Sequence, residues 1–507
     1  MLDRRSIYVL LAVIAVAIAC SHIVSAQRVY DPASYRLDNW PKTRPNPLPI
    51  YSSNDRSRWA TVRALVDNGT FVIGKRNLRT VQSSAIAPLG QLDPMGAATL
   101  AAAGYGERVA KSSNTGIIFE DGWESVDKVL DPDTMDFYSS KPPLLSTLVA
   151  GLYWLLHLLT GWTLTDQPNE VIRTLLLLIN GLPFAIYLRQ LAHLVEDWGR
   201  TDWARLYVFA VGAFATLVTP FLVTFNNHIV GTFAVMFAWV SLLRIARQPD
   251  NAPPWYHFVS VGFFSAFAAT NELPALAFAA AVFALLVWWY PRRALLMALP
   301  PALVVAAAFF VTNYAALGTW KVAYANTESV WYQYEGSHWR LAEGQKKTGI
   351  DWTRKGRPPD EREGDFAYGV HVLIGHHGWF SLTPVWLLAA AGMAVAWWRR
   401  RRPSAPLPAI VPDVTFFVSA VVILFYLAAS DNYGGFTNGL RWLMWLTPMW
   451  LTCLLPMVDL LAENRWGRRF AYVLLAVSIF SVSYEPWNPW RHPWIYDLMI
   501  ECGWRGY

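Results

Sequence analysis

Cysteines and charged residues are both scarce in this chain. Three cysteines, Cys20, Cys453 and Cys502, are spread over 507 residues, and only 15% of all residues are charged. The cysteines form neither a disulfide framework nor the Cys-x-x-Cys spacing of a metal site. Charges this sparse do not cover the surface of a soluble protein of this length. The composition therefore predicts an integral membrane protein.

The basic residues also lack the arrangement that binds nucleic acid. The formal net charge is +6, but lysine and arginine occupy short links between apolar runs and form no long patch or arm. We therefore expect no nucleic-acid partner. The basic residues are expected to orient the chain in a lipid bilayer.

Twelve apolar runs approach the length of about 20 residues that crosses a bilayer. They lie at 7–26, 142–162, 171–192, 203–223, 228–246, 255–271, 273–290, 294–316, 379–398, 411–430, 439–460 and 469–484. The first run also resembles a cleavable signal peptide, although the many later runs favour an uncleaved helix. The fold class predicted from this pattern is an all-α polytopic membrane protein.

The charge bias decides whether the run 142–162 crosses the membrane. If it stays on the outer surface, fourteen arginines near the ends of the other runs face the cytoplasm, as the positive-inside rule requires. The run opens with Lys141-Pro142-Pro143 and carries polar residues among its leucines, which is typical of a helix lying in the interface. We therefore predict about eleven transmembrane helices and a cytoplasmic N-terminus, with a crossing of 142–162 as the alternative.

This topology divides the chain into six parts. We expect a first transmembrane helix (1–26), an extracytoplasmic loop with interfacial helices (27–170), a transmembrane bundle (171–316), a second extracytoplasmic loop (317–377), a second bundle (378–484) and an extracytoplasmic tail (485–507). The second loop alternates aromatic and polar residues, which suits stacking on sugar rings or contact with lipid headgroups. The role of residues 68–136 is not predicted.

The first outer loop contains a short helix with a carboxylate near its start. The segment Asn54 to Asp67 has helical periodicity, with Asn54 or Ser53 as its cap. Its apolar face would carry Trp59, Val62, Leu65 and Val66. Asp55 stands at the beginning and Arg58 follows one turn later on a neighbouring face. The pattern joins a candidate general base to an anion-binding group.

A second polar cluster precedes the expected interfacial helix. The stretch from Asp131 to Lys141 contains three aspartates, Asp131, Asp133 and Asp136, together with Tyr138. Carboxylate oxygens of this kind suit Mg²⁺ or Mn²⁺. A divalent cation bound by these three aspartates is one interpretation, and solvated surface charges are the other.

The two segments NDRSRWATVRALVDNGTFVI and FYSSKPPLLSTLVAGLYWLL, followed by a train of apolar runs, resemble the GT-C class of membrane glycosyltransferases. Within that class, the chain is similar to the branch of protein O-mannosyltransferases and the lipid A aminoarabinose transferase. The matching positions are Asp55, Arg58-Trp59 and Lys141-Pro142-Pro143-Leu144. The chain departs from the pattern at Arg56, where a second carboxylate is usual, and at Ser140, where a glutamate commonly precedes KPPL.

The resemblance implies a GT-C-like fold and a hexosyl- or pentosyltransferase whose donor is a sugar on a polyprenyl phosphate. The acceptor would be an extracytoplasmic lipid, glycan or protein, and the transfer would invert the sugar carbon. It also implies Asp55 as the general base, with Arg58 and Lys141 binding the donor phosphate.

Other expected outer residues could complete such a pocket. Arg441 begins a span on the outer face, where the orientation rule disfavours a cation, so we predict that it binds phosphate. Glu272 lies at a span boundary, where a carboxylate is costly unless it has a role. The predicted pocket residues are Asn227, His228, Glu272 and Tyr138. A capped helix turn is the alternative for Asn227 and His228.

Two other functions fit a chain with many spans. A transporter or flippase of lipid-linked saccharides would carry ionisable residues in mid-span and broken helices in paired positions, and neither is prominent here. An O-antigen ligase or polymerase would have its large outer loop late in the chain, whereas the long loop here is early. The expected location is a bacterial cytoplasmic membrane, with the active site outside.

Overall fold

The computed structural model describes residues 3–27, 47–77, 114–247, 253–326, 329–338, 364–400, 407–430, 433–484 and 486–504. Across these ranges the chain is mainly helical, and each of the twelve apolar runs forms a helix. Eight of the described helices are long and apolar enough to cross a membrane. They span Arg4–Ser25, Pro143–Thr160, Pro168–Trp198, Asp202–Phe221, Asn227–Ala246, Pro291–Leu317, Ile410–Ala428 and Arg441–Leu461. The all-α, multi-span fold class is confirmed, and the number of eleven spans stays a prediction.

The chain divides into two compact units. The bundle unit comprises Met1–Ser25, Leu176–Ala308 and Thr348–Tyr507, and the α3 unit comprises Ala26–Leu175 and Phe309–Lys347.

The bundle unit is built from helices only, within the part of it that the structure describes. Its longer helices are α1 (Arg4–Ser25), α8 (Leu182–Trp198), α9 (Asp202–Phe214), α11 (Asn227–Ala246), α12 (Trp255–Asn271), α13 (Leu276–Trp289), α15 (Leu299–Leu317, which begins here), α18 (Val385–Arg399), α19 (Ile410–Ala429), α20 (Thr447–Leu461) and α21 (Arg465–Ser483). Its shorter elements are η4 (Leu177–Gly181), α10 (Val218–Phe221), η5 (Leu273–Ala275), α14 (Pro291–Arg293), η6 (Ala294–Ala298), α16 (Asp365–Leu373), α17 (Trp379–Leu382), η10 (Arg441–Leu446) and α22 (Trp494–Glu501).

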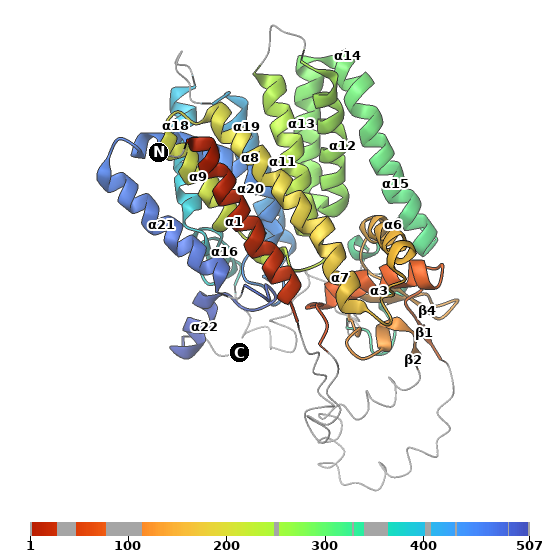
Figure 1. Ribbon diagram of the computed structural model, residues 1–507. Helices are drawn as coiled ribbons and strands as arrows, with labels where there is room; N and C mark the ends of the chain where they lie inside the picture. The colour runs from red at the N-terminus through yellow and green to blue at the C-terminus, as the bar shows by residue number, and fades with distance from the viewer. Residues whose placement is uncertain are drawn as a thin grey trace. The chain divides into compact units, whose positions relative to one another are not determined.

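Small residues allow the bundle helices to approach closely. Helix α11 packs along α12, α18 packs along α20, and α1 lies against α8 and α9 (Figure 1). A Cβ atom added at Gly392 of α18 would lie 1.9 Å from the carbonyl oxygen of Cys453 in α20. Gly262 of α12 has the same relation to Ala298, also at 1.9 Å. Contacts this close between backbones are typical of helix pairs in membranes.

Buried polar side chains tie the bundle helices together. Trp239 of α11 donates its indole N–H to Thr452 of α20 at 2.9 Å, and Trp450 of α20 donates to Ser419 of α19 at 3.0 Å. Asp459 near the end of α20 accepts the backbone N–H of Thr201, the cap of α9, at 2.8 Å. Because apolar packing alone gives little drive for helix association in lipid, such bonds help to fix which helices pair.

The α3 unit combines helices with a small sheet. Its elements are α3 (Ser53–Asp67), β1 (Gly74–Arg76), β2 (Asn114–Thr115), η3 (Ile117–Phe119), β3 (Lys128–Leu130), β4 (Asp136–Ser139), α6 (Pro143–Thr160), α7 (Pro168–Leu176), η7 (Ala323–Ala325) and η8 (Val330–Tyr332). The four strands are antiparallel in the order β2-β1-β4-β3. In register, Lys75 faces Thr115, Gly74 faces Phe137 and Val129 faces Tyr138. No strand was predicted from the sequence.

Helix α3 begins and ends where local chemistry dictates. Ser52 is its cap, because the Ser52 hydroxyl accepts the N–H of Asp55 at 3.1 Å. The chain leaves the helix at Gly69, whose φ of +66° suits glycine. The predicted caps, Asn54 and Ser53, lie inside the first turn instead. The predicted single apolar face is also wrong, because every residue from Asp55 to Ala64 is buried. Helix α3 is covered by α6, β4 and η3.

Helix α6 coincides with the run 142–162. Pro143 occupies its first turn, where the missing N–H costs nothing, and Gly161 ends it with a φ of +75°. The helix has 18 residues and is apolar enough to cross a membrane. Its placement in the interface stays a prediction.

The approach of α18 to α20 leads to a prediction about stability. Gly392→Ala is expected to destabilise the protein by about 1–3 kcal/mol, because the added methyl group overpacks the contact with Cys453. Gly151→Ala is the matched control, since Gly151 also lies in a helix and no described atom lies within 4 Å of the position that an added Cβ would take. Thermal unfolding in detergent measures both. Equal midpoints for the two variants would contradict the packing argument.

Candidate functional site

Asp55 is a buried carboxylate at the start of α3. Its exposed fraction is 1%. The backbone N–H of Tyr51 approaches Asp55 Oδ2 at 3.4 Å, and the positive end of the helix dipole favours a negative charge in this first turn. Arg58, three residues later on α3, has an exposed fraction of only 2%. The structure therefore places the predicted base and the predicted phosphate ligand together in the interior of the α3 unit.

Serine hydroxyls on α3 fix the neighbouring segment that carries Asp127. The Ser53 hydroxyl accepts the backbone N–H groups of Val126 at 2.8 Å and Asp127 at 3.1 Å. The Ser57 hydroxyl lies 2.5 Å from the carbonyl oxygen of Asp127 and 2.6 Å from the hydroxyl of Ser139 in β4. Hydrogen bonds on both sides of Asp127 hold its backbone against α3.

Lys141 forms an ion pair with Asp127. Lys141 Nζ lies 2.8 Å from Asp127 Oδ1, and the two side chains are only 16% and 9% exposed. Burial alone would raise the pKa of Asp127, but Lys141, the Ser53 hydroxyl and Arg58 together hold the pKa below its ordinary value of 3.8. Asp127 is thus charged and sits within the field of both predicted phosphate-binding cations. Sequence reasoning missed it, because nothing distinguishes Asp127 from the other acidic residues between 120 and 136.

Tyr332 brings the second predicted loop to this same cluster. It lies in η8 and its exposed fraction is 2%. Burial raises the pKa of the Tyr332 hydroxyl, and the charge of Asp127 raises it further, while a hydrogen bond with Ser140 lowers it. The phenol therefore stays neutral and can donate a hydrogen bond. We name Asp55, Arg58, Asp127, Lys141 and Tyr332 the α3 cluster.

Tyr138 points away from the α3 cluster. Successive side chains of a strand face opposite sides, and on β4 Ser139 faces Ser57 of α3. Tyr138 instead packs against Trp331, with ring centroids 5.7 Å apart. Burial raises the pKa of Tyr138, and Asp136 and Asp131 add to the shift. The sequence predicted Tyr138 as a pocket residue, but its side chain lies on the face of β4 that points away from the α3 cluster and thus from Lys141.

Of the three aspartates predicted to hold a metal, Asp131 and Asp133 lie in the turn between β3 and β4, and Asp136 begins β4. Asp131 Oδ1 accepts the N–H of Asp133 at 2.9 Å, and Asp136 lies 3.6 Å from Lys75 Nζ. Across the described ranges, no group of three or more histidine, cysteine or acidic residues is arranged to hold a metal ion. Metal binding by Asp131, Asp133 and Asp136 stays a prediction from the sequence.

The bundle unit brings four other predicted residues together. Asn227 and His228 begin α11, Glu272 follows α12, and Arg441 begins η10. Glu272 Oε1 pairs with His228 Nδ1 and accepts a hydrogen bond from Asn227 Nδ2 at 2.5 Å. The other imidazole nitrogen, His228 Nε2, contacts the Arg441 guanidinium. His228 and Glu272 are 3% and 4% exposed. We name these four residues the Glu272 cluster.

A glycine turn positions Arg441. The carbonyl oxygen of Gly434 accepts hydrogen bonds from Arg441 Nε at 3.2 Å and Nη2 at 3.0 Å. Gly434 has a φ of +91°, a conformation that side chains disfavour. The Arg441 guanidinium also lies over the ring of Trp490, 4.8 Å from its centroid. These contacts leave the guanidinium directed at His228, although its sequence position alone suggested only an outer cation.

Four histidines gather elsewhere in the bundle unit. His376 Nδ1 lies 2.5 Å from His377 Nδ1, His371 stacks on His376, and His492 stacks on Tyr496. Tyr433 packs against both His376 and His377. Burial lowers the pKa of His492 to about 4, so this imidazole is neutral at pH 7. The four rings pack against one another and against Tyr433 and Tyr496.

Neither a protein-family model nor a curated protein matches the chain. Among solved structures, it is similar to the crystal structure of the Archaeoglobus fulgidus oligosaccharyltransferase in the apo form, with a TM-score of 0.46 and 11% sequence identity. The match covers 96% of this chain and 56% of that chain, so this chain spans little more than half the length of that protein. A likeness this distant carries no argument about what the chain does.

The ion pair in the α3 cluster predicts a pH dependence. Because the folded state lowers the pKa of Asp127, the carboxylate stabilises the fold above its ordinary value of 3.8, and this contribution is lost as the pH falls below that value. Asp127→Asn is therefore expected to lower the unfolding midpoint at pH 7, and the difference from the wild type should shrink below about pH 4. Asp133→Asn, at an exposed turn position, is the control. A constant difference from pH 7 to pH 3 would contradict the assignment.

The Glu272 cluster predicts a cost for removing its carboxylate. Glu272→Ala removes the partner of the buried His228 imidazole and one of the two acceptors of the Asn227 amide, so we expect a loss of about 1–3 kcal/mol in the free energy of unfolding. Glu170→Ala, at an exposed position in the first turn of α7, is the matched control and should change little. Chemical denaturation in detergent measures both variants. A Glu272→Ala variant as stable as the control would show that the pairing contributes nothing.

Proposed function

We propose that the chain is a membrane glycosyltransferase of the GT-C kind, which moves a sugar from a polyprenyl-phosphate donor to an acceptor outside the cytoplasm. The motif resemblance around Asp55, Arg58 and Lys141 supports this class. The observation that carries the proposal is the α3 cluster itself. Asp55 and Arg58 precede Lys141 by more than 80 residues in the sequence, yet this buried carboxylate and these two cations belong to one compact unit.

In the proposed reaction, the acceptor hydroxyl oxygen attacks the anomeric carbon of the donor sugar. The bond between that carbon and the phosphate oxygen breaks, and the polyprenyl phosphate leaves with the electron pair. Asp55 takes the proton of the attacking hydroxyl, because a carboxylate held at a helix start can act as a general base. Attack opposite to the leaving group inverts the configuration at the sugar carbon.

The departing phosphate gains negative charge, and preorganised cations stabilise that charge. Arg58 and Lys141 supply two cations with little solvent around them, and Asp127 pairs with Lys141 and offsets part of their positive charge while no phosphate is bound. Tyr332 adds a neutral hydroxyl donor beside Asp127. The donor lipid would extend along apolar helices. For the bundle unit by itself, Arg441 of the Glu272 cluster is proposed as a phosphate-binding cation, and Asn227, His228 and Glu272 as pocket residues around it.

Loss of transfer in an Asp55→Asn variant tests the proposal. Membranes containing the wild type should transfer label from radiolabelled polyprenyl-phosphate sugars, and the variant should be slower by about 10²–10⁴-fold, the range of general-base catalysis. Glu170→Gln, with an exposed carboxyl group in the first turn of α7, is the matched control and should retain the wild-type rate.

Each outcome of this assay has a distinct meaning. Equal transfer by wild type and Asp55→Asn would move the role of base to another carboxylate, and Glu272→Gln would be the next variant to measure. No transfer by the wild type with any donor would favour the alternative function, a transporter or flippase of lipid-linked saccharide.

A further inference from the structure

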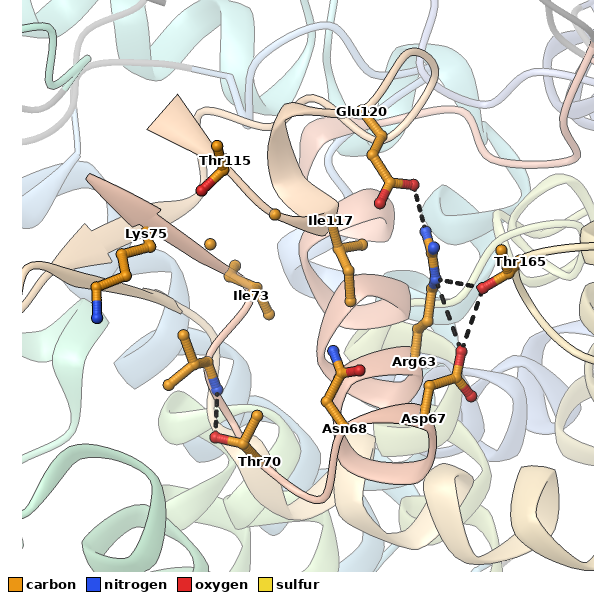
Figure 2. Close-up of a pocket in the computed structure, with 13 residues that line it drawn as sticks. Arg63, Asp67, Asn68, Thr70, Ile73, Lys75, Thr115, Ile117, Glu120 and Thr165 are labelled. Atoms are coloured by element: carbon orange, nitrogen blue, oxygen red, sulfur yellow. Dashed lines mark hydrogen bonds and ion pairs between the residues drawn. The ribbon is translucent and has the colours of Figure 1, made fainter. Parts of the chain in front are cut away.

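The α3 unit contains an open cavity at the end of α3 that lies opposite to Asp55 along the helix. Its volume is about 370 Å³, within the range of small-molecule sites. Figure 2 shows Arg63 between Glu120, Thr165 and Asp67 on one side, with Lys75 and Thr70 on the other. Helix α3, the segment that joins it to β1, strands β1 and β2, and η3 supply most of the wall. The proposed reaction uses none of these residues.

The charges around the cavity balance. Arg63 Nη1 lies 2.5 Å from Glu120 Oε2, and Arg63 Nε lies 3.7 Å from Asp67 Oδ2 and 3.1 Å from Thr165 Oγ1. Lys75 is the second cation of the lining. Two cations therefore face two carboxylates, and the Arg63 side chain, only 9% exposed, is already engaged by its partners. A lining without net charge favours an uncharged ligand over a phosphate or a metal ion.

The remaining polar groups suit a ligand that carries hydroxyls. Asn68 and Thr115 line the cavity, and a hydroxyl or amide group can both donate and accept hydrogen bonds. Sugar hydroxyls have the same dual character. Thr165 and Thr70 add further hydroxyls, and the carboxylates of Asp67 and Glu120 can each accept a hydrogen bond beyond their contact with Arg63.

An apolar strip completes the lining. Ile73 and Ile117 line the cavity between its polar walls (Figure 2), and both are buried residues. Gly116, with a φ of +103°, brings its backbone so close that an added Cβ would lie 2.6 Å from Gly74 Cα. Gly74 and Gly116 have no side chains, so nothing projects from this part of the wall into the cavity. An aliphatic strip flanked by hydroxyl and carboxylate groups matches a sugar ring, which has apolar C–H faces and a polar rim.

We propose that this cavity binds one or two neutral sugar residues and serves as a distal acceptor subsite of the transfer reaction. It would hold part of a longer acceptor glycan away from the attacking hydroxyl, because most of the length of α3 separates it from Asp55. The binding follows from the lining alone, whereas the role as acceptor subsite rests on the proposed function. A peptide is the competing ligand. The lining favours a sugar, because β2 has only two residues and both pair with β1, so the cavity offers side-chain groups and no long row of strand hydrogen bonds.

Saturation-transfer NMR on the full chain in nanodiscs, without any donor, tests the binding. The probes are lactose, maltose, mannobiose and diacetylchitobiose, each at about 5 mM, which detects the weak affinities expected of a small site. Acetyl-tetraalanine amide is the peptide probe. The wild type should bind at least one disaccharide, and the double variant Asn68→Leu/Thr115→Val should bind it about tenfold more weakly, since two hydrogen bonds are lost.

Two controls separate the binding from other effects. Thr134→Val removes an exposed hydroxyl of the same sheet that does not line the cavity, and it should leave the affinity unchanged. Asp55→Asn should lose transfer but keep disaccharide binding. Failure of transfer in every protein would then overturn the proposed function without touching the sugar site.

Three results would overturn the sugar site. They are the absence of binding of all four disaccharides by the wild type, equal affinity in the wild type and the double variant, and binding of the peptide probe that depends on Thr115. Each is measurable whether or not the donor of the reaction is known.

Discussion

The ion pair between Lys141 and Asp127 is the interaction on which the α3 unit depends. Lys141 stands at the entrance to α6, and Asp127 stands on a segment that Ser53 and Ser57 attach to α3. One charge pair therefore joins α3, the strand region and α6. Burying a lysine without a partner would cost several kcal/mol, so the pair and the hydrogen bonds around it form together or not at all. The same arrangement holds Arg58 and Tyr332 beside the fixed negative charge of Asp127. The ion pair therefore also organises the electrostatic environment of these two side chains.

The bundle unit also pairs its buried charges, but it does so with a different set of side chains. Glu272, His228 and Arg441 come from three separate places in the sequence, and each lies at the end of a helix that packs among apolar neighbours. A lone carboxylate or guanidinium in such surroundings is expensive, whereas a carboxylate, an imidazole and a guanidinium in series leave no charge without a partner. The carbonyl of Gly434 and the ring of Trp490 hold the last member in place. Holding a carboxylate, an imidazole and a guanidinium rigidly costs stability unless each of them has a partner, and here each has one.

Sequence patterns predicted the helices well because the membrane imposes one rule on all of them. An apolar run of bilayer length must satisfy its backbone internally, so each of the twelve runs is helical. The same patterns missed the sheet, since strands of two to four residues are too short to show a period of two. They also gave α3 a single apolar face, because the burial of Arg56 and Arg63 depends on partners far away in the sequence, the carbonyl of Glu124 and the carboxylate of Glu120. Asp55, Arg58 and Lys141 were found by motif, but Asp127 carried no local signal.

Asp127 changes how the two predicted phosphate-binding cations must work. A phosphate that approaches Arg58 and Lys141 meets cations whose charge Asp127 already offsets in part, so its gain at Lys141 is the difference between its own attraction and that of the Asp127 carboxylate. Cations without such a partner would bind the phosphate of the donor more tightly, and they would hold the released polyprenyl phosphate, which carries more negative charge, more tightly still. Uniform tight binding lowers KM without raising kcat. In the proposed reaction, a carboxylate that competes for the same cations favours the charge that develops during bond breaking over the charge of the resting donor, and Lys141 would return to Asp127 when the product leaves.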